Sequence, residues 1–298
     1  MSLSTSLGDA DLPPLFRTAD SASLRGQELY IRATKLRLGL AVAAAALAAT
    51  TIKPGETWDL AASLVALGFL ATLVLEIWLL GRNPERDWYD GRALAESVKT
   101  LSWRYSVAAA PFSRGLTDAE AEQRFVTEVE KLIGDAPADS VIVSAPVQVT
   151  PRMRGARSAD LVARRSLYLE HRIENQLAWY SSKATSNSKR ARGWRLTLIV
   201  IEGVGAVAAV LKAGGIVSFD LPGIMAALLG AGSAWFAVRQ YEALARAYAF
   251  AAKDLSTVHT RLCRIDDEAE WAREAGDAEE AISREHTMWR ASRGAYTG

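Results

Sequence analysis

The sequence predicts an all-α membrane protein with four transmembrane helices arranged as two hairpins. Half of the 298 residues are hydrophobic although 23% are charged, and the two kinds are segregated along the chain. A membrane-spanning helix needs about 20 largely apolar residues. Four stretches approach that length, and each is uncharged or carries a single acid: Leu38–Ile52, Leu60–Leu80, Leu196–Leu211 and Leu221–Val238.

These stretches differ from the helices of a soluble bundle. A bundle helix has a polar face that recurs every 3.6 residues, whereas Leu60–Leu75 and Leu221–Val238 have none. Lys53–Thr57 and Lys212–Pro222, which separate the members of each pair, contain the Pro and Gly residues that end helices. Because two stretches are short, four buried helices in a soluble bundle remain the alternative. We predict spans at about residues 36–53, 58–80, 194–212 and 220–238.

The distribution of Lys and Arg predicts the orientation. Each loop inside a hairpin holds one lysine, whereas bases cluster outside both hairpins. By the positive-inside rule, both termini and the middle segment are cytoplasmic. Trp58 and Trp235 lie near span ends, where an amphipathic ring suits the headgroup layer. The flanking bases are Arg25, Arg32, Lys35, Arg37, Arg82, Arg86, Arg92, Lys183, Lys189, Arg190, Arg192, Arg195, Arg239 and Arg246.

The composition argues against several classes of function. A net charge of +1 lacks the positive field that a general nucleic-acid binder needs. The single cysteine, Cys263, can form no internal disulfide, and it shares no metal-ligand spacing with His171, His259 or His286. The sequence contains neither a phosphate-binding glycine loop nor a nucleophile elbow. We therefore expect no enzyme activity, no metal and no cofactor.

Two acids inside predicted spans are the strongest chemical signals. Glu76 lies four residues from the cytoplasmic end of its span and Glu202 six residues from the start of its own. An acid within a spanning helix is costly and usually faces a partner, a cavity or a water-filled path. Repeated around an oligomer, these acids would form rings that favour cations. Alternatively, each reaches the interface or pairs with Arg82, Arg195 or another base.

Both hairpins are flanked by charged helices, which suggests an internal duplication. After the second hairpin we predict one long stalk helix over 239–275, a break at Gly276–Asp277 and a short helix over 278–291. Apolar residues recur along the stalk at alternating steps of three and four, the spacing of a coiled-coil seam. The seam packs either between subunits or within the chain. Its main members are Tyr241, Leu244, Tyr248, Leu255, Val258, Leu262 and Ile265.

The segment between the two halves contains one further predicted helix. Thr117 and Glu120 have the spacing of a capping box, which begins a helix that runs to about Ile133. Gly134–Arg157 contains three prolines and a β-prone Val141–Val143. We predict that it is a linker with at most one short strand.

Each half of the sequence contains a motif beside its hairpin. In the first half the motif is Trp88-Tyr89-Asp90-Gly91-Arg92-Ala93-Leu94-Ala95-Glu96-Ser97 with Lys99, Trp103, Arg104, Tyr105, Pro111 and Phe112; in the second it is Arg172, Ile173, Gln176, Trp179, Tyr180, Lys183, Ala184 and Asn187. Together these motifs resemble SLATT domains, which are two-helix membrane effectors found beside SMODS nucleotidyltransferases and SLOG sensors in bacterial conflict systems. The resemblance implies two tandem modules, at residues 15–112 and 159–298, joined by a helix and linker at 113–158. We predict that residues 1–14 are disordered.

The motif residues have two alternative roles, packing and ligand contact. Arg92, Glu96 and Lys99 lie three to four residues apart on one helix, where opposite charges pair. Trp88 and Trp103 would anchor that helix against its neighbour or the membrane surface. Packing is the role that the residues themselves favour.

The resemblance implies a membrane pore or disruptor that a nucleotide signal or a sensor protein triggers. We therefore expect an oligomeric, ion channel-like effector in the inner membrane of a bacterium, acting in conflict or stress. Four spans are too few to enclose a wide pore, so this function requires self-assembly. The alternative is a non-conducting membrane scaffold or sensor that binds a partner through its coiled-coil helices.

Overall fold

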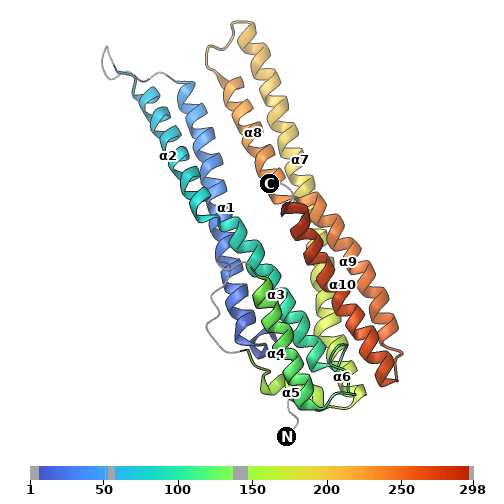
Figure 1. Cartoon of the computed structure of the whole chain (residues 1–298). Helices are drawn as coiled ribbons and strands as arrows, with labels where there is room; N and C mark the ends of the chain where they lie inside the picture. Colours follow the sequence, from blue (N-terminus) through green and yellow to red (C-terminus); the bar gives the residue numbers. More distant parts are fainter. Residues whose placement is uncertain (1–6, 51, 53–57, 137–146, 295–298) are drawn as a thin grey trace. The chain divides into compact units, whose positions relative to one another are not determined.

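The computed structural model describes residues 7–50, 52, 58–136 and 147–294, with side chains up to residue 283, and this part of the chain is helical (Figure 1). The α-helices are α1 (Pro14–Ala48), α2 (Leu60–Arg82), α3 (Pro84–Ser106), α4 (Asp118–Asp135), α5 (Pro151–Ser158), α6 (Leu161–Tyr168), α7 (Asn175–Ala213), α8 (Leu221–Arg239), α9 (Tyr241–Leu262) and α10 (Glu268–Gly294). A π-helical segment, Leu169–Glu174, joins α6 to α7.

The chain divides into two units. The first, which we call the packed unit, comprises residues 1–27, 85–182 and 247–298. The second, the apolar unit, comprises residues 28–84 and 183–246. Each unit draws on both halves of the sequence, so the predicted duplication does not fold as two separate globules.

Aromatic side chains fill the centre of the packed unit. Tyr105 meets Phe112 and Phe125 edge-on, with ring centroids 5.9 and 5.6 Å apart, and Tyr168 meets Trp271 in the same way at 5.9 Å. All five rings are buried. Each such contact adds about 0.5–1.5 kcal/mol to the stabilisation from burying apolar surface. Four of these residues come from α3, α4, α6 and α10, and Phe112 lies in the loop between α3 and α4. This core therefore joins the two halves of the chain.

Helices α1 and α3 approach each other closely at Gly91. A Cβ atom built at this position would lie 2.9 Å from the backbone nitrogen of Ser23 and 3.0 Å from the carbonyl oxygen of Ala19. The Ser23 hydroxyl donates a hydrogen bond to the Trp88 carbonyl at 2.9 Å. Glycine is therefore required here for packing.

The predicted stalk helix over 239–275 is wrong. Helix α9 ends at Leu262, and α10 begins at Glu268 and runs beside it as a hairpin (Figure 1). Asp267 begins α10 because its carboxylate accepts hydrogen bonds from the backbone nitrogens of Ala269 and Glu270, at 3.0 and 2.8 Å. The buried Ile265 occupies the turn. The apolar spacing continues through the turn because both helices face one core.

The predicted break at Gly276–Asp277 and the separate helix over 278–291 are also wrong, because α10 continues through both to Gly294. Gly276 instead permits a close contact: a Cβ atom at this position would lie 3.2 Å from the Ala110 carbonyl oxygen. The Ala110 nitrogen donates to the Ala272 carbonyl at 2.7 Å. The lack of a side chain at Gly276 therefore lets α10 pack closely against the segment around Ala110.

The segment between the halves is partly as predicted. Thr117 and Glu120 form the expected capping box at the start of α4. The prediction of a linker over Gly134–Arg157 is wrong at its end, where α5 forms. Thr150 accepts from the Met153 nitrogen at 3.3 Å, and Pro151 suits the first turn of a helix. Val141–Val143 lies outside the described residues.

The prediction of disorder over residues 1–14 is wrong from Leu7 onward. Leu7 and Leu12 are buried in the packed unit. Between them Asp9–Asp11 forms a 3-10 turn, and the Asp9 carboxylate lies 2.6 Å from Lys99 Nζ. Two leucine anchors and an ion pair thus order this segment, and residues 1–6 are outside the described range.

Three helical stretches in the described chain are long and apolar enough to cross a membrane: Leu60–Ser106, Leu161–Ala213 and Leu221–Leu262. Within the molecule, 6%, 6% and 0% of their most apolar windows are buried. The first predicted span, 36–53, does not qualify, because α1 ends at Ala48 and its last eighteen residues contain Arg32, Lys35 and Arg37. The four-span topology therefore remains a prediction.

Candidate functional site

Glu76 lies on α2 beside a base of α1. Its Oε2 atom is 2.8 Å from Arg37 Nη1, and the two side chains are 46% and 39% exposed. The pair joins the two helices of the first hairpin. One of the two alternatives for an intramembrane acid is that it reaches the interface or pairs with Arg82, Arg195 or another nearby base. For Glu76, the base in contact is Arg37.

Glu202 has a different environment. It lies on the exposed surface of α7, and no base in the described part of the chain lies within ion-pair distance. Arg195, about two turns earlier on the helix, pairs with Glu242. Ile199, three residues earlier on the same helix, is an exposed apolar neighbour of Glu202. The acid therefore interrupts an apolar surface.

The predicted seam residues, on α9 and in the turn that follows it, pack largely within the chain. Leu255, Val258, Leu262 and Ile265 belong to the core of the packed unit, and Tyr248 contacts its edge. Tyr241, in the apolar unit, is also buried, and Leu244 is half-buried. Packing within one chain thus accounts for their burial without a second subunit.

Seven of the motif residues, drawn from both motifs, line a cavity of about 400 Å³ in the packed unit. One wall is a single face of α3, and a second is the π-helical segment with the start of α7. The third is the ordered N-terminal segment with the start of α1. The lining residues are Leu7, Gly8, Asp9, Phe16, Asp20, Arg92, Glu96, Lys99, Trp103, His171, Arg172, Asn175, Gln176 and Trp179. The cavity therefore brings the two motifs, which are far apart in the sequence, into one place.

The cations of this cavity have carboxylate partners. Arg92 Nη2 lies 2.7 Å from Glu96 Oε1, and Lys99 Nζ lies 2.6 Å from Asp9 Oδ1. Lys99 also lies over the Phe16 ring, 5.4 Å from its centroid. The cavity is thus lined by charged pairs and aromatic rings rather than by an excess of one charge.

Arg172 lines the cavity and also belongs to a buried network of polar side chains. Its guanidinium donates to both carboxylate oxygens of Glu279 on α10, each at 2.8 Å. The Tyr168 hydroxyl donates to the same carboxylate at 3.0 Å. Burial raises the pKa of Tyr168 well above its usual value, and the Glu279 charge raises it further. Burial lowers the pKa of Arg172, but the Glu279 charge and hydrogen bonds more than reverse this, so the guanidinium stays protonated.

Several other motif residues contact neighbouring side chains or backbone groups. Trp88 stacks on Tyr89, Arg104 donates to the Gly276 carbonyl at 2.7 Å, and Tyr180 stacks on Tyr248. Tyr105 is in the aromatic core described above. Burial, aided by the Glu122 charge, raises its pKa to about 12 although Arg157 opposes the shift. Sequence reasoning did not identify Glu279 or Tyr168, because only the fold brings α10 and α6 to Arg172.

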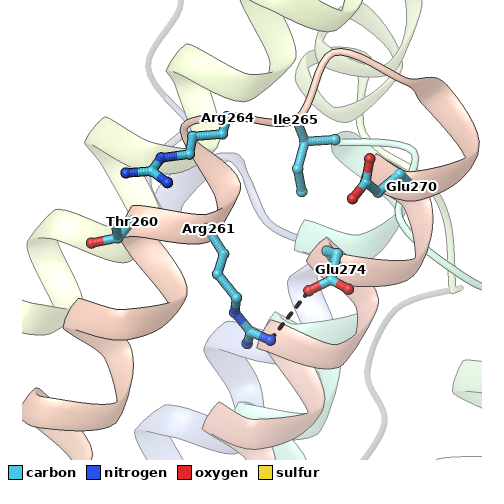
Figure 2. A pocket seen from close by; sticks show the side chains of 6 residues that line it. All are labelled: Thr260, Arg261, Arg264, Ile265, Glu270 and Glu274. Atoms are coloured by element: carbon cyan, nitrogen blue, oxygen red, sulfur yellow. Dashed lines mark ion pairs between the residues drawn. The ribbon is translucent and has the colours of Figure 1, made fainter.

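A second, smaller cavity of about 270 Å³ lies at the α9–α10 turn (Figure 2). Figure 2 shows Arg261 reaching across it to Glu274, with atoms 3.5 Å apart. Thr260, Arg264, Ile265 and Glu270 complete its lining. None of these residues belongs to the predicted motifs.

The exposed apolar helices and the helical packed unit define an α-helical protein of the membrane-associated class. The chain belongs to the SLATT family: residues 13–165 match the SMODS and SLOG-associating 2TM effector domain 3, and residues 168–289 match the SMODS and SLOG-associating 2TM effector domain 1. The prediction of two tandem modules is thereby confirmed. The first match includes residues 113–158, predicted as a helix and linker. No curated protein and no solved structure matches the chain.

Proposed function

We propose that this protein assembles in the bacterial inner membrane as an oligomeric, cation-conducting pore. The observation that carries the proposal is Glu202, an exposed acid on an apolar helix without a basic partner in the described chain. A carboxylate at that depth in hydrocarbon costs several kcal/mol unless it meets water or a polar partner. A water-filled path between copies supplies that environment.

The surfaces of the apolar helices support assembly. On α2, Leu67, Phe69 and Leu70 are 57–67% exposed, and on α7 Val207 and Val210 are 61% and 71% exposed. In a membrane these surfaces contact lipid or another copy of the chain. Since one chain offers too few spans to enclose a wide aqueous path, several copies would be needed.

The signal that opens the pore would act on the packed unit. By the positive-inside rule it is cytoplasmic, together with both termini. Its family associates with SMODS and SLOG proteins. We therefore propose that a nucleotide signal or a sensor protein acts on this unit. The cavity that gathers both motifs is the first place to look for such contact.

The test is single-channel recording from the purified full-length protein in planar bilayers, with particle symmetry determined from the same sample. We expect closed rings, discrete cation-selective currents, and a marked loss of cation selectivity in Glu202→Gln. Glu130→Gln, which removes an exposed acid from α4 in the packed unit, is the matched control and should conduct as wild type does. If Glu202→Gln and wild type have the same selectivity, Glu202 is not in the path. Monomers or dimers without current would favour a non-conducting scaffold.

A further inference from the structure

We propose that Lys35 and Arg239 together bind the phosphate of an anionic membrane lipid, at a site where the first hairpin meets the second. This inference requires that the apolar helices lie in a bilayer, but not that the assembled protein conducts ions. Both residues belong to the apolar unit.

One aromatic ring brings the two cations together. Lys35 Nζ, from α1, lies 5.5 Å from the centroid of the Trp235 ring, and the Arg239 guanidinium carbon lies 5.6 Å from the same centroid. The two charges are therefore at most about 11 Å apart, a separation that their long side chains can reduce. Cation–ring attraction accounts for each contact with Trp235, but it neutralises neither charge.

Unlike Arg32, Arg37 and Arg195 of the same unit, these two cations have no acidic partner in the described part of the chain. Arg32 pairs with Glu28, Arg37 with Glu76 and Arg195 with Glu242. Among the residues that the structure describes, no carboxylate lies within ion-pair distance of Lys35 or Arg239. The Arg239 Nε atom donates to the Tyr241 hydroxyl at 3.3 Å, a neutral partner that orients the guanidinium. Two cations near one ring and without an acidic partner attract an anion to that region of the surface.

The position along the helices indicates which anion. Arg239 is the last residue of α8, whose most apolar window is 0% buried within the molecule. Lys35 lies three residues before the uncharged end of α1 that begins at Leu38. Both cations thus lie where an apolar stretch ends, and Trp235 and Tyr241 are residues typical of the headgroup layer. Basic sites between membrane helices bind lipid phosphates at this depth.

Native mass spectrometry of the full-length protein tests the proposal, after extraction from nanodiscs that contain equal amounts of phosphatidylglycerol and phosphatidylcholine. We expect wild type to retain phosphatidylglycerol preferentially. The double variant Lys35→Gln/Arg239→Gln should lose that preference by at least several-fold, whereas Lys35→Arg should keep it. The control Arg82→Gln/Arg192→Gln removes two exposed bases without a described ion-pair partner, neither of which contacts Trp235, and should retain the lipid.

Three results would overturn the proposal. Equal loss in the two double variants would mean that general positive charge holds the lipid. No headgroup preference in wild type would mean that no such site exists. Displacement of the lipid by millimolar inorganic phosphate would mean a site for free anions rather than for membrane lipid. Because Lys35 is exposed, Lys35→Gln alone should fold and show a partial loss if the double variant is unstable.

Discussion

Arg172 and Glu279 form a two-pronged ion pair in the interior of the packed unit. Nε and Nη2 of Arg172 donate to Oε1 and Oε2 of Glu279, both at 2.8 Å, and the side chains are 3% and 0% exposed. Arg172 is one of the second-module motif residues, and Glu279 is on α10. The pair therefore joins the π-helical segment that precedes α7 to α10.

The first prediction is that Glu279→Gln strongly destabilises the packed unit. The substitution leaves Arg172 charged, buried and without a counter-charge, which typically costs about 3–5 kcal/mol. Urea unfolding of the detergent-solubilised protein, followed by circular dichroism, measures the loss.

Glu122→Gln is the matched control. Arg154 also donates two hydrogen bonds to the Glu122 carboxylate, at 2.7 and 2.9 Å, but these side chains are 48% and 32% exposed. Solvent screens an exposed pair, so its loss should cost at most about 1 kcal/mol. Equal losses in the two variants would show that burial of the Arg172 pair is unimportant.

The second prediction concerns the contact between α1 and α3. Gly91→Ala places a methyl group against the Ser23 and Ala19 backbone, which cannot move aside as a flexible side chain can. Overpacking of this kind costs about 1–3 kcal/mol. Gly155→Ala, in α5, meets open space and should stabilise by about 0.5–1 kcal/mol. Thermal unfolding of both variants gives the comparison, and a stable Gly91→Ala protein would refute the close packing.

The third prediction is a loss of stability at alkaline pH through Tyr105. Its pKa is raised in the folded protein from 10.0 to about 12, because burial disfavours the charged phenolate. The raised pKa of Tyr105 contributes to the unfolding free energy. That contribution is fully present below pH 10 and is lost as the pH rises from 10 to 12, by up to about 3 kcal/mol. Tyr105→Phe keeps the ring and removes the titration. The difference in unfolding free energy between variant and wild type should therefore move in favour of the variant between pH 8 and pH 11.5; a constant difference would contradict the assignment.

The helix types and the apolar stretches could be predicted because they depend on local periodicity and composition. The capping box of Thr117 and Glu120 is an example, since both members lie within one turn. The α9–α10 turn could not be predicted in the same way. Ile265 continues the apolar spacing of α9 because the turn packs on the same core, so a pattern of spacing alone could not locate the end of the helix.

The sequence could identify which residues belong to the candidate sites, but not how these residues are arranged in space. Arg92, Glu96 and Lys99 were expected on one helix face, and the structure places them in the wall of one cavity with Arg172 and Trp179. That arrangement depends on contacts between segments about 80 residues apart, which no local pattern encodes. The same reason explains why Arg37, 39 positions from Glu76, was not singled out as its partner.

The last prediction concerns the Arg37–Glu76 pair. Removing the charge of either residue should change the cation selectivity, but in opposite directions. Arg37→Gln frees the Glu76 carboxylate, so it should strengthen cation selectivity if Glu76 lies near the conduction path. Glu76→Gln frees the Arg37 charge and should weaken it. Because the pair is partly exposed, either change should alter the unfolding free energy by at most about 1 kcal/mol.

Reversal potentials in a tenfold KCl gradient separate the two effects, and the double variant Arg37→Gln/Glu76→Gln should lie between the single variants. Raising the salt concentration should shrink all of these differences, since the Debye length falls to about 3 Å at 1 M. Shifts in the same direction for both single variants would mean that they act by disturbing the α1–α2 contact. Unchanged selectivity in both would place Glu76 and Arg37 away from the ion path and leave Glu202 as the acid to pursue.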